Sequence, residues 1–275
     1  MTNTNLPPLR EVIAEHDLAA RKGLGQHFLL DLNLTAKIAR LTGAGPGDLV
    51  LEVGPGPGGL TRALLDTGAE VLAVERDARV VPILEEMRAA YEGRLSWASD
   101  DALRVDEPAI LQRTPALLAS NLPYNISTEL LVKWLTASPR WWSRMVLMFQ
   151  REVGDRILAG PGTKTYGRLS VLAQLASTPS LGFHLPARAF TPPPKVDSSV
   201  LVFERTERPA WLPALERVTA AAFGQRRKMV RSSLKPVFAD ALGDALAAAG
   251  VPETARAEAV SPARYAALAR ALSAR

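Results

Sequence analysis

The run Asn121-Leu122-Pro123-Tyr124 combines residue types that could act on the amino group of a nucleobase. Such an amine is a poor nucleophile because its lone pair is delocalised into the ring. The Asn121 side-chain oxygen and the Leu122 carbonyl could accept its two N–H bonds and direct the lone pair towards a methyl group. Pro123 would stiffen the turn, and the Tyr124 ring could stack on a displaced base. The same four residues also fit an ordinary Asn-Pro turn that leads into a helix.

A glycine-rich run at residues 54–59 could hold a nucleoside cofactor. Gly54 and Gly56 would let the chain turn sharply and let a ligand lie against bare backbone. Glu75 follows Gly54 by 21 residues, a position where a carboxylate can accept both hydroxyls of a ribose. The pair Asp100-Asp101 could bind an adenine amino group, although a helix cap or a solvated loop fits this pair at least as well when it is taken alone.

The glycines of this run match the pattern of dinucleotide-binding loops and also the looser pattern of methyltransferase loops. Pro55 and Pro57 separate the two classes, because each removes a backbone N–H and a pyrophosphate needs such donors. S-adenosylmethionine carries no phosphate, so the prolines favour this cofactor over NAD. A tight strand-to-helix turn that binds no ligand is the structural alternative.

Short apolar runs alternate with helical patterns and predict the elements that position these residues. The predicted strands span residues 49–53, 70–75, 94–98, 116–121, 145–150 and 198–204, and the predicted helices span residues 60–67, 78–91, 127–137 and 168–177. Strands that alternate with helices indicate a mainly parallel sheet covered by helices. We therefore expect an α/β fold in which the glycine run follows the first strand and Asn121 ends the fourth.

The composition indicates a globular chain. Its 275 residues are 47% hydrophobic and 22% charged, and this length exceeds what one domain usually needs. The chain has no Cys and three scattered His, so a disulfide framework, thiol catalysis and a zinc-thiolate site are excluded and no metal is expected. The lack of Cys fits a reducing cytoplasm, and neither a signal peptide nor a membrane-spanning run is expected.

Positive charge is concentrated in the last quarter of the chain. Residues 206–275 contain 11 Lys and Arg against 6 Asp and Glu, a surplus that equals the net charge of +5 of the whole chain. This stretch is also Ala-rich and helical in pattern. We expect one domain at residues 1–205 and a second, helical domain at residues 206–275 that binds nucleic acid.

Five cations of this second region follow one another without an acid between them. They are Arg226, Arg227, Lys228, Arg231 and Lys235. At helical spacing, three of them would share one face and form a stripe: Arg227, Arg231 and Lys235. Such a stripe could follow a phosphate backbone without reading bases, and its alternative is the solvated surface of a helix.

Five runs, in order from about residue 20 to about residue 240, resemble the small-subunit ribosomal RNA adenine dimethyltransferases of the KsgA/RsmA type. They are GLGQHFL (23–29), GPGPGG (54–59), NLPY (121–124), FTPPPKVDS (190–198) and FGQRRK (223–228). The resemblance implies a class I S-adenosylmethionine-dependent methyltransferase fold, a Rossmann-like sheet with a small all-α C-terminal domain. It also implies methyl transfer to N6 of two adjacent adenosines in the 3′-terminal hairpin of 16S rRNA, with S-adenosylhomocysteine as the product.

The resemblance further implies which residues contact the cofactor. Carried onto this chain, these contacts fall on His27, Leu29, Gly54, Glu75, Asp101 and Asn121. His27 stands where the family commonly has asparagine, and its imidazole could still bond the carboxylate end of the cofactor in a manner sensitive to protonation. A capping or partly buried histidine is the alternative. Phe190 and the prolines after it could form a second wall of the base pocket and contact RNA, or Phe190 could serve in packing.

The implied partner is small-subunit rRNA in an assembling 30S subunit, during ribosome biogenesis, and a monomer would suffice. Two other functions stay open. A large-subunit rRNA adenine methyltransferase of the macrolide-resistance type shares the glycine run and the tetrapeptide, whereas residues 193–198 and 225–228 favour the small-subunit family. A non-catalytic ribosome-assembly or RNA-binding factor could keep the fold, although the intact run at residues 121–124 argues against it.

Overall fold

The computed structural model describes residues 6–20 and 25–275, and its internal contacts divide into two compact units. The first unit is Met1–Arg151 with Ser180–Glu204, and the second is Glu152–Pro179 with Arg205–Arg275. The division after Glu204 lies close to the boundary expected at residue 206. The contacts of residues 152–179 differ from that expectation, because the sequence analysis assigned this stretch to the first domain.

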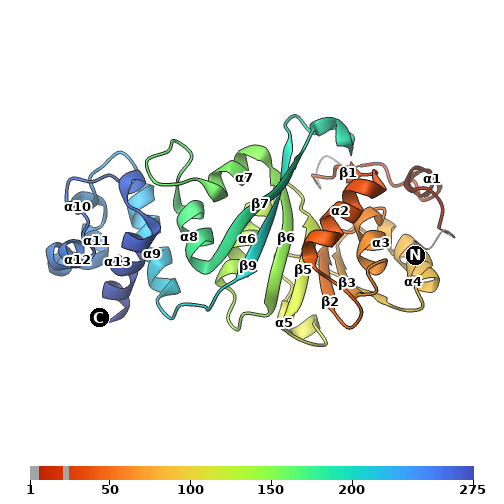
Figure 1. Ribbon diagram of the computed structural model, residues 1–275, viewed down its shortest axis with the longest axis horizontal. Coiled ribbons are helices and arrows are strands. Elements are labelled where there is room, and N and C mark those ends of the chain that lie inside the picture. Colours follow the sequence, from red (N-terminus) through yellow and green to blue (C-terminus); the bar gives the residue numbers. More distant parts are fainter. Residues whose placement is uncertain (1–5, 21–24) are drawn as a thin grey trace. The chain divides into compact units, whose positions relative to one another are not determined.

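The first unit is organised around a seven-stranded sheet (Figure 1). Its strands, in spatial order, are β4 (Leu95–Ser99), β3 (Glu70–Glu75), β2 (Leu49–Val53), β5 (Ala116–Asn121), β6 (Trp142–Gln150), β9 (Ser198–Arg205) and β7 (Ser177–Leu185). The strands from β4 to β6 pair in parallel, and β9 pairs antiparallel with β6. Every residue of β2 is buried, which is typical of a central parallel strand covered on both faces.

The strand order determines where a ligand can bind. Starting from β2, the chain adds β3 and β4 on one side and then β5 and β6 on the other, so the order reverses between β2 and β5. In open α/β sheets, ligands bind outside the carboxyl ends of the strands at such a switch point. The glycine run follows β2 and Asn121 ends β5, and both therefore lie at this position.

Most of the predicted strands agree with the structure. The bounds of β2, β3 and β5 are those expected, β4 is shifted by one residue, β9 ends one residue later and β6 begins at Trp142 instead of residue 145. The strand β7 is absent from the prediction. It contains Pro179 and Gly182, which are both unfavourable in strands, and most of its residues are at least partly exposed.

The helices of the first unit include three that the sequence analysis omitted, α1, α2 and α5. The observed helices are α1 (Leu9–Glu15), α2 (Leu32–Thr42), α3 (Gly59–Leu65), α4 (Val81–Ala90), α5 (Glu107–Ile110) and α6 (Ser127–Thr136), with 3-10 turns η2 (Ala78–Val80) and η3 (Ala187–Ala189). The omitted α2 has clear end signals. Asp31 accepts the Asn33 and Leu34 backbone N–H groups at its start, and Gly43 adopts a left-handed conformation at its end.

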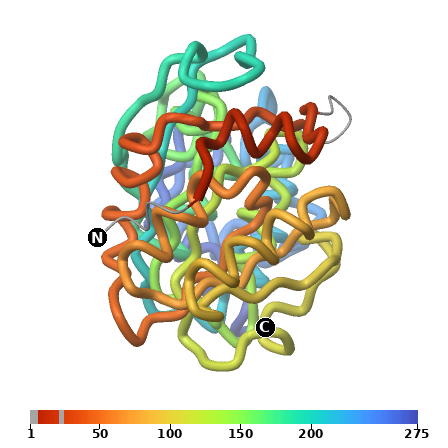
Figure 2. The backbone as a smooth tube through the Cα atoms, turned by 90° about the vertical axis from the view of Figure 1, so that its right-hand side faces the viewer, coloured from red at the N-terminus to blue at the C-terminus, as the bar shows by residue number. Residues whose placement is uncertain are grey.

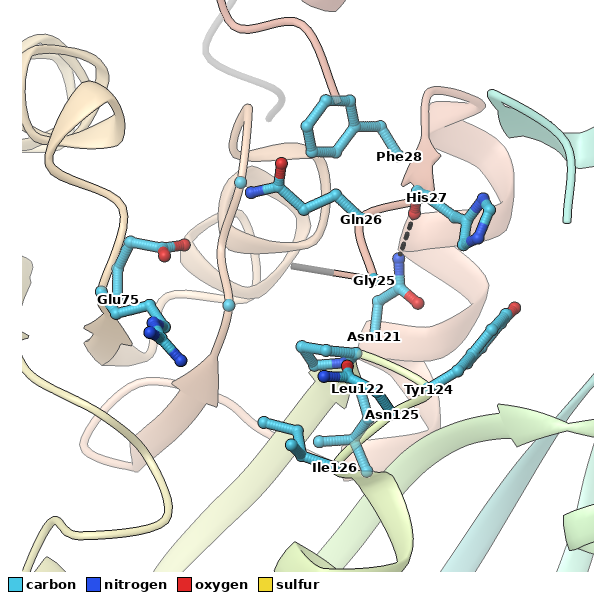
Figure 3. A pocket seen from close by; sticks show the side chains of 14 residues that line it. Gly25, Gln26, His27, Phe28, Glu75, Asn121, Leu122, Tyr124, Asn125 and Ile126 are labelled. Carbon is cyan, nitrogen blue, oxygen red and sulfur yellow. Dashed lines mark hydrogen bonds between the residues drawn. The ribbon is translucent and has the colours of Figure 1, made fainter. Parts of the chain in front are cut away.

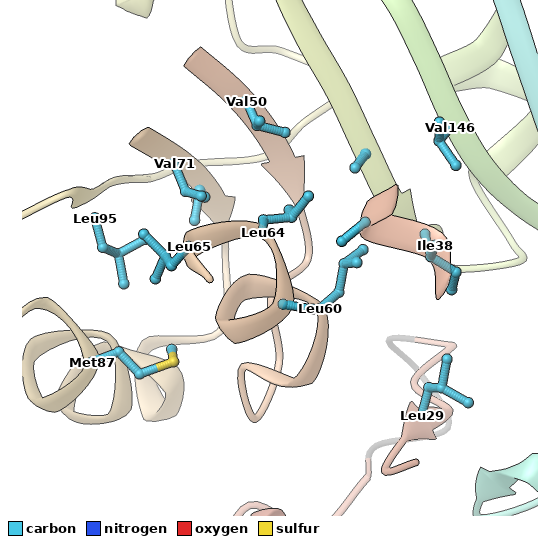
Figure 4. Close-up of a cluster of buried hydrophobic side chains, with 14 of the residues drawn as sticks. Leu29, Ile38, Val50, Leu60, Leu64, Leu65, Val71, Met87, Leu95 and Val146 are labelled. Atoms are coloured by element: carbon cyan, nitrogen blue, oxygen red, sulfur yellow. The ribbon is translucent and has the colours of Figure 1, made fainter. Parts of the chain in front are cut away.

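One face of the sheet is covered by α2, α3 and α4. Figure 4 shows their side chains packed towards the strands: Ile38 from α2, Leu60, Leu64 and Leu65 from α3, and Met87 from α4, against Val50, Val71, Leu95 and Val146. Full burial of one such side chain contributes roughly 1.5–3 kcal/mol. All residues of α3 are buried, so this packing fixes the helix that begins directly after the glycine run.

Residues 6–20, which include α1, lie along the same unit (Figure 2). The Arg62 side chain of α3 donates to the Pro7 carbonyl at 2.7 Å and holds the chain just before α1. Further along, β1 (Phe28–Leu29) pairs antiparallel with β8 (Phe190–Thr191). Two stretches more than 160 residues apart in sequence are thereby joined beside the sheet.

The second unit is helical. Its helices are α7 (Arg151–Leu158, of which the first residue belongs to the first unit), α8 (Arg168–Ala176), α9 (Leu212–Gly224), α10 (Val230–Ser233), α11 (Lys235–Phe238), α12 (Leu242–Ala248) and α13 (Pro262–Ser273), with 3-10 turns η4 (Ala239–Ala241) and η5 (Ala257–Ala259). Helix α9 packs against both α13 and α8. The packing of α8 explains why residues 152–179 group with the C-terminal helices.

The structure corrects the expectation of one continuous basic helix. Residues 225–228 form turns, and two separate short helices, α10 and α11, follow. Met229 instead makes an isolated β-bridge with Arg256, and the Val230 N–H donates to the Ala255 carbonyl at 2.8 Å. These tertiary hydrogen bonds replace the helical ones, so Arg227, Arg231 and Lys235 do not lie on the face of a single helix.

Candidate active site

One pocket of the first unit is lined by four stretches that are distant in sequence (Figure 3). They are residues 25–28, Gly54 and Gly56 of the glycine run, residues 75–76 and residues 121–126. The tetrapeptide, the glycine run and Glu75 therefore meet at one place. Glu75 lies on one side of the pocket, and Asn121 and Tyr124 lie on the other.

The glycine run leaves β2 in a conformation that favours glycine. Gly54 and Gly56 have φ angles of +71° and +52°, in the left-handed region. A Cβ on Gly56 would stand 3.2 Å from the Phe28 ring, and a Cβ on Gly54 would stand 4.0 Å from the Pro123 side chain. The backbone of this run is thus bare where it borders the other walls of the pocket, as close contact with a ligand requires.

Glu75 ends β3 as a nearly buried carboxyl group, 8% exposed. Its Oε1 accepts the backbone N–H of Asp77 at 2.8 Å. Burial raises the pKa of Glu75, and the backbone N–H groups of Asp77 and Arg76 oppose this rise. An acceptor held at the end of this strand is well placed for the hydroxyls of a ribose.

The side chain of Asn121 is oriented by the backbone of His27. Its Nδ2 donates to the His27 carbonyl at 3.0 Å, the interaction drawn dashed in Figure 3. Because a carbonyl only accepts, the amide nitrogen must face His27 and the amide oxygen must face elsewhere. Within the described residues, Asn121 Oδ1 accepts no hydrogen bond. The site therefore holds a fixed amide acceptor.

The rest of the tetrapeptide turns the chain from β5 towards α6. The Ile126 N–H donates to the Pro123 carbonyl at 3.2 Å, which closes the turn. Leu122 has a buried side chain, and its carbonyl accepts no hydrogen bond from any described residue. The Tyr124 hydroxyl lies 2.6 Å from the Ser198 hydroxyl, and burial raises the pKa of Tyr124. The Tyr124 ring is thus anchored at its polar end while it lines the pocket.

The imidazole of His27 contacts Pro192 and Tyr124. Its Nδ1 lies 2.8 Å from the Pro192 carbonyl, and its ring stacks on Tyr124 with centroids 5.4 Å apart. Nδ1 must carry the proton in this contact, because the carbonyl can only accept. His27 also lines the pocket, so a contact with a cofactor could involve Nε2. That contact stays a prediction.

Leu29 and Phe190 are packing residues in this structure. They pair across β1 and β8, their side chains are 5% and 3% exposed, and neither is among the residues that line the pocket. The packing alternative for Phe190 therefore fits better than a direct contact with RNA. Of the run at residues 23–29, Gly23 and Leu24 lie outside the described residues.

Asp101 lies beside the pocket without lining it. Its Oδ2 is 3.4 Å from Nη1 of Arg76, which does line the pocket, and its Oδ1 accepts the Leu103 N–H at 3.0 Å. The predicted contact of Asp101 with an adenine stays a prediction. Six lining residues were not selected individually from the sequence: Gly25, Gln26, Phe28, Arg76, Asn125 and Ile126. Gly25, Gln26 and Phe28 belong to the run at residues 23–29, and the other three lie within two residues of a selected residue, so proximity in sequence was the available signal.

The residues of the pocket fit S-adenosylmethionine. The bare backbone at Gly54 leaves room, Glu75 supplies a buried acceptor, and Pro55 and Pro57 remove donors that a phosphate would need. Within residues 6–20 and 25–275, no group of three His, Asp or Glu side chains could hold a metal ion. No helix in that part of the chain is long and apolar enough to span a membrane.

The predicted RNA-binding cations lie in the second unit. Arg227, Lys228, Arg231 and Lys235 are exposed. Arg226 differs from them, because its Nε lies 3.2 Å from Glu258 Oε2 and its Nη2 donates to a backbone carbonyl. These cations thus occupy turns and short helices at the surface, where phosphate groups can reach them.

The sequence is similar to proteins that act on ribosomal RNA. Residues 18–273 match the family model described as ribosomal RNA adenine dimethylase. A protein from Ruegeria sp. (strain TM1040), named ribosomal RNA small subunit methyltransferase A, is 56% identical and covers 98% of this chain and 97% of its own length. A protein of the same name from Maricaulis maris (strain MCS10) is 53% identical over 98% of this chain and 96% of its own.

Solved structures share the fold. A dimethyladenosine transferase from Plasmodium falciparum superposes with a TM-score of 0.74 at 22% identity, over 88% of this chain and 96% of that chain. The 23S rRNA methyltransferase ErmE superposes with a TM-score of 0.68 at 27% identity, over 90% of this chain and 99% of that chain. The predicted fold class, a methyltransferase sheet followed by a helical region, is confirmed.

Proposed function

This chain belongs to the ribosomal RNA adenine dimethylase family, and from that premise we propose how its pocket serves the reaction. The protein is an S-adenosylmethionine-dependent enzyme that dimethylates adenine in small-subunit ribosomal RNA, so the family and the activity predicted from the sequence are confirmed. The large-subunit alternative is not favoured, because relatives named for the small subunit are 53–56% identical whereas ErmE is 27% identical.

The finer description of the substrate is part of the proposal. We propose that the targets are N6 of two adjacent adenosines in the 3′-terminal hairpin of 16S rRNA. The substrate would be the assembling 30S subunit in the cytoplasm, and the enzyme would act as a monomer. The five runs that resemble the small-subunit family support this target, and the exposed cations of the second unit suit an RNA partner.

Four groups of the first unit would hold the cofactor. Glu75 would accept the ribose hydroxyls, and Gly54 and Gly56 would border the cofactor with bare backbone. Asp101 would bond the adenine ring, and the segment around His27 would border the methionine end. S-adenosylmethionine supplies an electrophilic methyl group when bound. The burial of Glu75, with only 8% of its surface exposed, supports its place as an acceptor shielded from water.

The single observation that carries the catalytic proposal is the hydrogen bond from Asn121 to the His27 carbonyl. It turns Asn121 Oδ1 away from His27, where this oxygen can accept one N–H of the target amine, and the Leu122 carbonyl can accept the other. Both bonds pull the amine nitrogen towards a tetrahedral shape and direct its lone pair at the methyl carbon. With S-adenosylmethionine bound, a new N–C bond would form as the C–S bond of the methyl donor breaks, and the nitrogen would then release its proton to water. Tyr124 would stack on the displaced base.

The second unit would hold the RNA. We propose that Arg226, Arg227, Lys228, Arg231 and Lys235 bind phosphates from the turns and short helices in which they lie. Such contacts give affinity and register but do not read bases. In this proposal, base selection belongs to the pocket of the first unit.

The test of this function is transfer of a labelled methyl group. The enzyme is incubated with labelled S-adenosylmethionine and either unmethylated small subunits or large-subunit rRNA, and the label is mapped. We expect dimethyladenosine in the small-subunit RNA, and label on cytosine or on large-subunit RNA alone would refute the assignment. Asn121→Ala should reduce transfer at least 100-fold, since one lost donor or acceptor of this kind costs that much. Asn33→Ala, on the exposed start of α2, is the matched control.

A further inference from the structure

Asp77 connects the proposed cofactor acceptor to the segment that lines the pocket. This residue follows Glu75 by two positions, and its side chain is 3% exposed. Nothing in the proposed reaction uses it. Its backbone N–H donates to Glu75 Oε1 at 2.8 Å, so Asp77 contributes directly to the orientation of the carboxyl group that would bind the ribose.

The carboxylate of Asp77 binds Arg79 through two oxygens. Arg79 Nε donates to Oδ1 at 3.0 Å, and Nη2 donates to Oδ2 at 2.6 Å. This fork-to-fork geometry is the strong form of an Arg–carboxylate pair. The guanidinium accordingly lowers the pKa of Asp77. The Arg79 side chain is 23% exposed, so the pair lies largely out of solvent.

Arg79 uses its remaining nitrogen on the N-terminal segment. Its Nη1 donates to the carbonyl of Asp17 at 3.3 Å and to that of Ala19 at 3.2 Å. On the other side of residues 21–24, Gln26 Nε2 donates to Asp77 Oδ2 at 3.4 Å. Both described flanks of the segment at residues 17–28 are therefore held by Asp77, one of them through Arg79.

The part of the segment that Asp77 holds also reaches both halves of the pocket. Phe28 lies against Gly56, the His27 carbonyl accepts the Asn121 amide, and a Cβ on Gly25 would stand 2.7 Å from Asn125 Oδ1. A displacement of this segment would thus change the border of the cofactor pocket. The bonds from Gln26 and Arg79 to the Asp77 carboxylate fix this segment, and the bond from the Asp77 N–H fixes Glu75. All of them therefore help to hold the walls of the pocket in place.

We propose that Asp77 is a positioning residue for S-adenosylmethionine, which holds Glu75 and residues 17–20 and 25–28 in the arrangement that binds the cofactor. The proposal rests on the proposed function, because it assigns Asp77 to the cofactor pocket of that enzyme. The alternative is a purely local role. Asp77 also accepts the Arg79 backbone N–H and so caps the 3-10 turn η2.

The variant Asp77→Asn separates the two roles. Asparagine keeps the shape and is an equally good cap, but it loses the charge that strengthens the bonds to Arg79. We expect the dissociation constant for S-adenosylmethionine, measured by calorimetry on the full chain, to rise at least 10-fold. The single-turnover rate at saturating cofactor and RNA should fall by a smaller factor than the affinity, because Asp77 touches no reacting atom and reaches Asn121 only through the segment that contains the His27 carbonyl.

A double-mutant comparison with Arg79→Met tests the route of the effect. If Asp77 acts through Arg79, the two single variants and the double variant should raise the dissociation constant for S-adenosylmethionine by similar factors. Glu85→Gln, an exposed charge change on α4, is the matched control and should leave the dissociation constant within 2-fold. Arg79→Met also keeps the proposal testable should Asp77→Asn fail to fold.

Three results would contradict the proposal. Asp77→Asn could be folded, as judged by its melting temperature, and bind the cofactor within 2-fold of wild type. The losses of affinity for S-adenosylmethionine caused by Asp77→Asn and by Arg79→Met could multiply in the double variant, which would mean that the two residues act independently. Finally, the dissociation constant could be unchanged while the saturated rate falls. Failure of the proposed function is distinguishable, because the wild-type protein itself would then bind no S-adenosylmethionine.

Discussion

The buried carboxyl of Glu52, two residues before the glycine run, makes the stability of this protein dependent on pH. Its side chain is 1% exposed, and burial raises its pKa from 4.5 to about 8, with the neighbouring Glu75 carboxylate adding to the rise. Within the described residues, Glu52 Oε2 has no hydrogen-bond partner. Near neutral pH the folded chain therefore keeps a proton on Glu52 that the unfolded chain releases.

The proton counts give the sign and the size of the effect. Between pH 4.5 and pH 8 the folded state binds more protons than the unfolded state, so the free energy of unfolding decreases as the pH rises. The loss is about 1.4 kcal/mol per pH unit within this window and levels off near the upper limit. Between pH 6 and pH 8 it amounts to about 2 kcal/mol. Glu52→Gln has nearly the same shape and cannot ionise, so it should remove this loss.

Urea unfolding at pH 6, 7 and 8 measures this difference. We expect the free energy of unfolding of Glu52→Gln, relative to wild type, to increase by about 2 kcal/mol from pH 6 to pH 8. Glu85→Gln, which changes an exposed charge, should follow the wild-type pH dependence. If the curves of Glu52→Gln and wild type run parallel, Glu52 does not carry a proton in the folded state and the reasoning from burial is refuted.

Two further predictions concern the cofactor pocket and the RNA surface. Gly54→Ala places a methyl group on a left-handed residue facing Pro123, so we expect about 1–2 kcal/mol lower stability in urea and S-adenosylmethionine binding weakened about 10-fold or more in calorimetry. An unchanged affinity for S-adenosylmethionine would mean that the glycine run does not border the cofactor. Alanine at Arg227, Arg231 and Lys235 together should weaken RNA binding and reduce the slope of log K against log salt by about 2. An unchanged slope would mean that these three side chains do not contact RNA phosphates.

Features that depend on local sequence alone were the most predictable. The strand β2 is a continuous apolar run except for Glu52, and the glycines after it can be recognised because few other residues adopt their φ angles. The parallel alternation of strands and helices then places the ends of β2 and β5 at one edge of the sheet. From these two facts the meeting of Gly54, Glu75 and Asn121 could be predicted.

Features that depend on distant contacts could not be predicted. The orientation of His27 depends on Pro192, a residue 165 positions away, and this contact turns the imidazole towards Tyr124. The basic helix was a wrong prediction because Met229 pairs with Arg256, a contact that no local periodicity reveals. Asp77 lies next to a recognised motif, yet its partners Asp17, Ala19 and Gln26 come from another part of the chain.

The adjacency of β2 and β5 sets the spacing between the glycine run and Asn121, which follow these two strands. Glu52 lies opposite Ala119 in the parallel ladder, and the Ser120 hydroxyl donates to the Val53 carbonyl at 2.6 Å where both strands end. Hydrogen-bonded strands keep a separation of about 4.8 Å that side chains barely alter. In the proposed function, the residues that would border the methyl donor and those that would hold the target amine therefore follow two neighbouring hydrogen-bonded strands. The loops around the pocket can then differ in sequence without changing the distance between these two strand ends.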